Sequence, residues 1–173
     1  GTEERNVSDA LGRVLARDAL ARRSNPPAAN SAVDGYGFAH ATTGEGPQTL
    51  PLVEGRAAAG VPFRGGVPTG MAIRILTGAI LPEGVDTVVL EEDTASDGRR
   101  VAFHGPVKAR SNTRKAGEDV AAGAVALPIG HRLRPPDLAL LSAVGAARVS
   151  VFRPLRMGVL STGDEIAPDA GEA

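Results

Sequence analysis

Glycine and proline constrain this chain more than any other feature, because both interrupt long regular elements. The sequence holds 22 glycines and 13 prolines among 173 residues, about a fifth of the chain, against roughly 12% in average proteins. Long helices are therefore not expected. Only four phenylalanines and one tyrosine are present, while 42% of the residues are hydrophobic, so we expect a core of alanine, valine, leucine and isoleucine.

Between these breaks, short alternating or β-branched runs predict strands joined by turns. Strands are expected over residues 71–76, 85–90, 101–103, 149–152 and 157–160. The last run is apolar throughout, which is typical of the buried first strand of an α/β unit. The sequence therefore predicts a mainly β chain with α+β elements, in which the strands form a barrel or a coiled sheet.

Two short helices are expected outside the strand-rich region. Ser8 can cap a helix over residues 10–16, where apolar side chains recur at helical spacing. The Pro-Pro pair at 135–136 suits the first turn of a helix that continues over residues 137–144 and stops at Gly145.

Charge and cysteine content exclude several classes of protein. The chain has 19 lysines and arginines against 20 aspartates and glutamates, a net charge of -1, so nucleic acid or a membrane surface is not expected as a partner. Without cysteine there can be no disulfide, thiolate nucleophile, iron–sulfur cluster or sulfur-ligated zinc, and the cytoplasm is the expected compartment. The stretches free of charge are shorter than the ~18 apolar residues of a membrane span.

Familiar nucleotide and metal motifs do not account for the chain. Residues 60–65 have the glycine spacing of a phosphate-binding loop, but Gly66 stands where that loop requires lysine. The three histidines, His40, His104 and His131, lie far apart in unrelated contexts. We therefore interpret them as surface or turn residues.

Two polar segments in the first half of the chain combine turn residues with side chains suited to chemistry. Residues 30–38 read Asn-Ser-Ala-Val-Asp-Gly-Tyr-Gly-Phe, and Asp34-Gly35 suits a tight turn because both residues tolerate positive φ. Residues 74–79 read as a strand that runs into a glycine turn, where Thr77 either bonds the local backbone or meets a ligand.

Two further segments carry charge. Residues 112–119 contain Arg114 and Lys115 before Glu118 and Asp119; they could hold a polyanion together with a metal, or form a solvated charged hairpin. Residues 161–165 follow an apolar run. The glycine loop there could bind an anion, and the adjacent carboxylates could bind Mg²⁺. Alternatively, the segment could be a helix N-cap.

In this order and at this spacing, the four segments closely resemble those of the molybdopterin molybdenumtransferase family, which includes the bacterial MoeA proteins and the gephyrin E domain. The resemblance rests on residues 30–36, 74–79, 114–119 and 160–165. It implies an enzyme of molybdenum cofactor synthesis that takes molybdate and adenylylated molybdopterin, inserts the metal and releases AMP. Mg²⁺ is the cofactor that it implies.

The resemblance, together with the chemistry of the segments, also gives roles to single residues. Asp34, Asp119 and Glu165 are expected to be catalytic, and Asp164 and Glu165 to be metal ligands through their carboxylate oxygens. Substrate phosphates and molybdate require fixed hydrogen-bond donors. We expect these from Thr77, Arg114, Lys115, Ser161, Thr162 and Gly163.

Members of the family look like elongated homodimers of four-domain chains, with the active site between subunits. By this resemblance, residues 1–44 and 109–152 would form a mixed linker domain and 45–108 an inserted β-barrel. Residues 153–173 would be the first strand and loop of a molybdopterin-binding α/β domain. The chain is thus expected to be an inactive part of a longer enzyme, with a molybdopterin adenylyltransferase as partner.

Two alternative functions remain open. Eukaryotic relatives carry a receptor-anchoring activity, so a non-catalytic scaffold or binding module is one of them. A paralogue acting on a related pterin or nucleotide is the other. Asp34, Asp119 and Glu165 together favour the enzyme, because a scaffold has no chemical need for this set.

Overall fold

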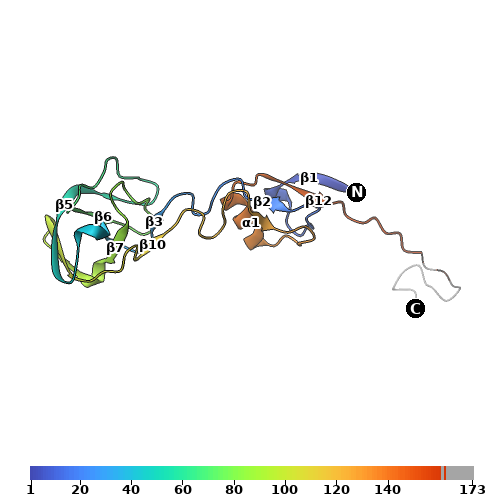
Figure 1. The fold of residues 1–173 in the computed structure, drawn as a ribbon. Coiled ribbons are helices and arrows are strands. Elements are labelled where there is room, and N and C mark those ends of the chain that lie inside the picture. The colour runs from blue at the N-terminus through green and yellow to red at the C-terminus, as the bar shows by residue number, and fades with distance from the viewer. Residues whose placement is uncertain (161, 163–173) are drawn as a thin grey trace, which may run out of the picture.

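The structure is a computed structural model that describes residues 1–160 and residue 162. It consists of two lobes connected by extended segments, so the molecule is elongated (Figure 1). One lobe, here called the sheet lobe, is built around a six-stranded sheet. The other, the helical lobe, contains the single α-helix of the described residues, and the N-terminus lies at its outer end.

The sheet lobe has the strand order β7-β4-β6-β5-β9-β8, and the sheet curls into a half-barrel. Neighbouring strands are antiparallel except for β5 and β6, which are parallel. The strands are β4 (Gly35–Phe38), β5 (Gly46–Ala57), β6 (Ala72–Ile75), β7 (Thr87–Leu90), β8 (Thr94–Ser96) and β9 (Arg100–Gly105). Single turns of 3-10 helix follow β4 and β7, namely η2 (His40–Thr42) and η3 (Glu91–Asp93). The expected mainly β fold with a coiled sheet is confirmed.

The core of the sheet lobe is made mostly of small apolar residues on alternate strand positions. Ile73 and Ile75 of β6, and Val88 of β7, are fully buried. The exception to the small side chains is a stacked pair, Phe38 and Phe103, whose ring centroids are 5.1 Å apart. Two of the five aromatic residues therefore hold one side of this core together.

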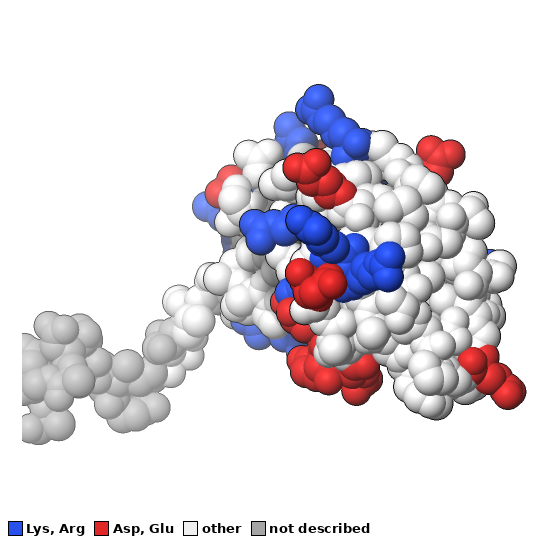
Figure 2. Space-filling view, turned by 90° about the vertical axis from the view of Figure 1, so that its left-hand side faces the viewer, with Lys and Arg blue, Asp and Glu red and all other residues white. Residues whose placement is uncertain are grey.

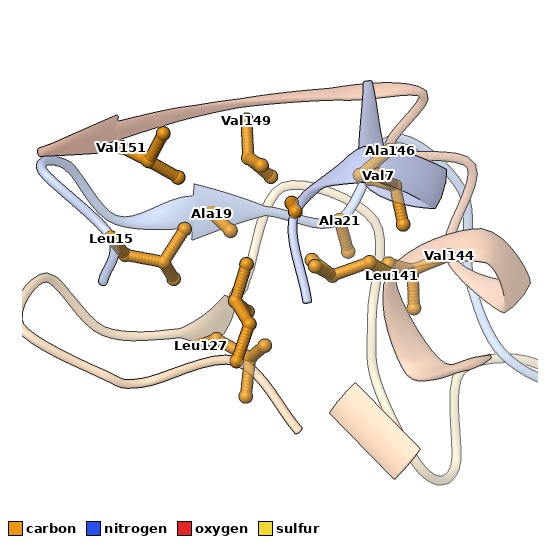
Figure 3. Close-up of a cluster of buried hydrophobic side chains, with 12 residues drawn as sticks. Val7, Leu15, Ala19, Ala21, Leu127, Leu141, Val144, Ala146, Val149 and Val151 are labelled. Atoms are coloured by element: carbon orange, nitrogen blue, oxygen red, sulfur yellow. The ribbon is translucent and has the colours of Figure 1, made fainter. Parts of the chain in front are cut away.

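The helical lobe combines two short sheets with one helix. β1 (Thr2–Asn6) pairs with β12 (Arg148–Phe152), and β2 (Ala19–Leu20) pairs with β11 (Val125–Leu127). The helix α1 (Pro135–Ala143) covers them, and η1 (Val7–Asp9) packs beside it. Figure 3 shows alanine, valine and leucine side chains from η1, β2, β11, α1, β12 and the loops between them, among them Leu15, Leu141 and Val151, meeting in one core.

The helix expected after the two prolines is confirmed as α1, and its first turn is well satisfied. The carboxylate of Asp137 accepts hydrogen bonds from the backbone N–H of Arg134 at 2.8 Å and from the Arg134 side chain at 3.1 Å. The ring nitrogen Nε2 of His131 lies 2.8 Å from the same carboxylate. These bonds lower the pKa of Asp137 far below its ordinary value, the Arg134 side chain being the main cause.

Two expected elements are wrong. The helix over residues 10–16 does not form, because Gly12 has φ +75° and because Leu15 and Ala16 donate their backbone N–H groups to His131 and Ser150 of other segments. The strand over residues 157–160 is absent as well. A buried strand needs hydrogen-bonded neighbours, and no described residue supplies one to this run, whose side chains are exposed.

Among the described residues, no helix is both long and apolar enough to span a membrane.

Candidate functional site

Three of the four polar segments meet at β3 (Asn30–Ser31). On one side, β3 pairs antiparallel with β10 (Thr113–Arg114), so that Arg114 lies opposite Asn30. On the other side, Ser31 donates its N–H to the carbonyl of Ala79 at 2.9 Å and accepts the N–H of Gly78 at 2.8 Å. Figure 1 shows β3 and β10 side by side where the sheet lobe joins the connecting segments.

Asp34, the first expected catalytic residue, is fixed by Thr77. Its Oδ1 accepts hydrogen bonds from the backbone N–H and from the hydroxyl of Thr77, both at 2.7 Å. Asp34 is exposed, and no bond from a described residue reaches its Oδ2. The carboxylate therefore has one anchored oxygen and one oxygen that a ligand can approach.

The bonds from Thr77 also set the charge of Asp34. The Thr77 hydroxyl and then the Thr77 N–H lower the pKa of Asp34 below its ordinary value, and the positive charge of Arg74 acts in the same direction. A carboxylate that accepts two hydrogen bonds is stabilised in its ionised form. Asp34 is thus a fixed anion at neutral pH.

The glycine after Asp34 has a different role from the one expected. Neither Asp34 nor Gly35 has a positive φ, so the tight turn through left-handed backbone, one of the alternatives for this segment, does not form. Gly35 is instead the first residue of β4, and a Cβ at this position would overlap the carbonyl oxygen of Val89. Glycine is required because two strands approach closely, which holds Asp34 against β7 and η3.

Two residues that sequence reasoning did not single out flank Asp34. Arg74 pairs with Tyr36 in the register of β6 and β4, and its guanidinium lies 5.3 Å from the centre of the Tyr36 ring. Nη2 of Arg74 bonds Oε2 of Glu91 at 2.6 Å. Arg74 belonged to a quoted segment, but the position of Glu91 follows only from the pairing of β4 with β7, which no local pattern reveals.

In the charged segment around β10, Arg114 is paired with the two carboxylates that follow it. Arg114 donates to Glu118 at 3.1 Å and also pairs with Asp119. Oε2 of Glu118 accepts the N–H of Lys115 at 3.0 Å. This N–H and the Arg114 side chain lower the pKa of Glu118, and Glu118 is the main cause of the raised pKa of Arg114.

Asp119 is held from two sides. Arg114 engages its Oδ1, while Nδ2 of Asn25 lies 3.4 Å from its Oδ2. Its backbone N–H donates to the carbonyl of Asn25 at 3.0 Å. In contrast to Asp34, Asp119 has both carboxylate oxygens engaged, whereas the Lys115 ammonium group is paired with no described residue.

Charge compensation extends over the end of the sheet lobe. Figure 2 shows basic side chains near the middle of this face with acidic side chains next to them. Electrostatic attraction for a large polyanion is therefore reduced on this face, and local donors matter more than overall charge.

The fourth segment contributes little to this description. Ser161, Gly163, Asp164 and Glu165 lie outside the described residues, and Thr162 is exposed without regular structure. Within residues 1–160 and 162, no group of three or more histidine, aspartate or glutamate side chains could hold a metal ion. Asp164 and Glu165, the expected Mg²⁺ ligands, are not among these residues, and no step below is assigned to a metal.

Comparisons with known proteins agree on one family. The family model for the MoeA N-terminal region (domain I and II) matches residues 1–145. The chain is 40% identical over 167 residues to a molybdopterin molybdenumtransferase of Haemophilus influenzae, covering 95% of this chain and 41% of that protein. It is 37% identical over 161 residues to one of Synechococcus elongatus, covering 90% of this chain and 40% of the relative.

A solved structure gives the same result. The molybdopterin biosynthesis MoeA protein of Pyrococcus horikoshii superposes with a TM-score of 0.80 at 37% identity, over 87% of this chain and 41% of that chain. This chain thus spans well under half the length of each of these three relatives.

Proposed function

The chain belongs to the molybdopterin molybdenumtransferase (MoeA) family, and from this premise we propose that it acts in molybdenum cofactor biosynthesis. The reaction is insertion of molybdenum from molybdate into adenylylated molybdopterin, with release of AMP. The observation that carries the proposal is the meeting of three polar segments around β3, where Asp34 presents a fixed carboxylate with one accessible oxygen.

The geometry supports different proposed roles for the two described carboxylates. A carboxylate with a lowered pKa is a weak general base, so Asp34 serves to orient a water, a hydroxyl or another substrate group through Oδ2. Asp119 has both oxygens engaged by Arg114 and Asn25. Its role is to hold the loop that carries Lys115.

Donors for the substrate come from the same junction. The Lys115 ammonium group can meet a phosphate, because its loop leaves this charge uncompensated, whereas Arg114 is occupied by Glu118 and Asp119. Thr77 acts on substrate through Asp34, to which it donates. Ser161, Thr162 and Gly163 remain proposed anion donors, and Asp164 and Glu165 proposed Mg²⁺ ligands.

The complete reaction requires more than this chain. Because the chain spans only 41% and 40% of the two relatives, we propose that the longer protein supplies the remaining substrate contacts. It would do so as a cytoplasmic homodimer with its active site between subunits, and with a molybdopterin adenylyltransferase as partner. The division into a linker domain (1–44 and 109–152), an inserted domain (45–108) and the start of an α/β domain stays a prediction.

The test is the Asp34→Asn variant of the full-length protein. The amide keeps the size of the side chain but removes its charge, so we expect molybdenum insertion to fall about 100-fold. Asp97→Asn is the matched control, because one carboxylate oxygen of Asp97 likewise accepts two hydrogen bonds in the same lobe, here from backbone N–H groups at 2.8 and 2.7 Å. Full activity of Asp34→Asn in a protein as stable as the control would contradict the role of Asp34 and favour the scaffold alternative.

A further inference from the structure

Arg74 connects the elements on both sides of Asp34. It lies on β6, its guanidinium covers the Tyr36 ring on β4, and its Nη2 bonds Glu91 at the start of η3. The backbone N–H of Glu91 in turn donates to the carbonyl oxygen of Asp34 at 3.1 Å. A single side chain thus links β6 to η3 across the end of β4, where Asp34 sits.

The position of Arg74 costs free energy of folding, so stability alone does not explain why an arginine stands there. The Arg74 side chain is only 26% exposed, and its Nη1 is buried with no hydrogen-bond partner among the described residues. A buried donor without a partner is destabilising. An apolar or shorter polar side chain over Tyr36 would avoid this loss, but it would not reach Glu91.

Arg74 is the charged group that acts on the Asp34 carboxylate. It approaches from β6, pairs with Glu91 of η3 and lies over the ring of Tyr36 on β4. Since Glu91 pairs with Arg74, the cation stays fixed in its position near the Asp34 carboxylate rather than swinging into solvent.

We infer that Arg74 is a positioning residue for Asp34: through Glu91 and Tyr36 it holds the Asp34 backbone between β6 and η3, and so fixes the direction of the carboxylate. This inference rests on the proposed function of Asp34. Arg74 itself contacts no substrate, because its Nη2 is committed to Glu91 and its Nη1 is buried.

The test uses single and double variants of the full-length enzyme. Arg74→Gln should lower kcat about 10- to 100-fold with KM nearly unchanged, because misplacing a reacting group affects the transition state more than binding. Arg56→Gln is the matched control, since Arg56 is the register partner of Arg74 on β5 and is exposed. The control should change kcat less than twofold.

The double variant separates positioning from general structural damage. In the Asp34→Asn background, Arg74→Gln should cause no further loss of kcat, because the residue that it positions is already disabled. The kcat of Arg74→Lys should lie between those of the wild type and Arg74→Gln. Lysine keeps the positive charge, but unlike the planar guanidinium of arginine it cannot cover Tyr36 and bond Glu91 at the same time. If Arg74→Gln does not fold, Glu91→Gln is expected to show the same non-additivity with Asp34→Asn.

Three results would overturn the inference. Independent, additive losses from Asp34→Asn and Arg74→Gln would show that Arg74 acts elsewhere. An inactive Asp34→Asn with an unaffected Arg74→Gln would overturn this inference while the role of Asp34 stands. Full activity of Asp34→Asn would overturn both.

Discussion

At the scale of single residues, the site depends on close approach as much as on charge. Next to Asp34, Gly35 lets β4 lie directly against the Val89 carbonyl. Any side chain there would push the strand away and move the Asp34 carboxylate with it. The glycine is therefore as necessary to the geometry as Thr77, although it has no functional group.

Gly35→Ala should consequently destabilise the chain, by about 1–3 kcal/mol, because the added methyl group must displace backbone. Thermal or urea unfolding measures this. Gly44→Ala is the control, since a Cβ at Gly44 meets no atom within 4 Å and its φ is not positive; its effect should stay within about 0.5 kcal/mol. Equal stability of the two variants would show that β4 can shift freely.

At the scale of elements, the sequence pattern predicted those helices and strands that are determined by their own residues. The strands β6, β7 and β9 have alternating or β-branched sequences, and α1 begins at two prolines, so their own residues are sufficient to identify them. β3 and β10 are two residues each and form through pairing with segments that are distant in the sequence, so no periodicity could have revealed them.

The residues of the site likewise fall into those that the sequence could identify and those that only the fold identifies. Asp34 and Thr77 could be chosen from the sequence because of their residue types, but their 2.7 Å contact depends on the register of β4 and β6. Arg74 and Glu91 become significant only through long-range pairing. The helix predicted at residues 10–16 is an opposite case, in which a local pattern was misleading. Its apolar spacing favours a helix, but hydrogen bonds to distant segments outweigh that preference.

The N-terminal turn of α1 should make the stability of the helical lobe depend on pH. The pKa of Asp137 is lowered in the folded chain, so its contribution is complete above its unfolded pKa of about 3.9 and is lost as the pH falls further toward the folded value. Wild-type chain should therefore exceed Asp137→Asn in melting temperature near pH 5, and the margin should shrink as the pH falls below about 4.

Melting temperatures of both proteins across this range provide the measurement. Asp9→Asn is a suitable control, because Asp9 lies in the same lobe but is exposed and makes only longer contacts of 3.3 and 3.5 Å. A margin that grows as the pH falls below about 4 would contradict the assignment.

At the scale of the whole molecule, the two lobes have separate cores. The buried cluster around Leu141 contains residues of the helical lobe only, whereas those around Phe38, Ile75 and Ile73 belong to the sheet lobe. Packing defects should therefore remain local, since distant sites without shared contacts behave independently.

Leu141→Ala tests this independence. Leu141 is fully buried, so we expect a loss of about 2–5 kcal/mol and faster amide hydrogen exchange in the helical lobe alone. Leu155→Ala, at a position that is 88% exposed, should leave exchange unchanged in both lobes. Faster exchange of β4 to β7 in Leu141→Ala would show that the lobes are coupled.

The pairing of β3 with β10 brings the two ends of the sheet lobe together. Ser31 lies directly opposite Thr113, one strand spacing of about 4.8 Å away, so the chain departs for the sheet lobe and comes back at almost the same point. A two-residue turn could close that gap. The sheet lobe could therefore be deleted, exchanged or enlarged as a unit without changing the path of the rest of the chain. Asp34 and Thr77 belong to this unit and would be moved or lost with it.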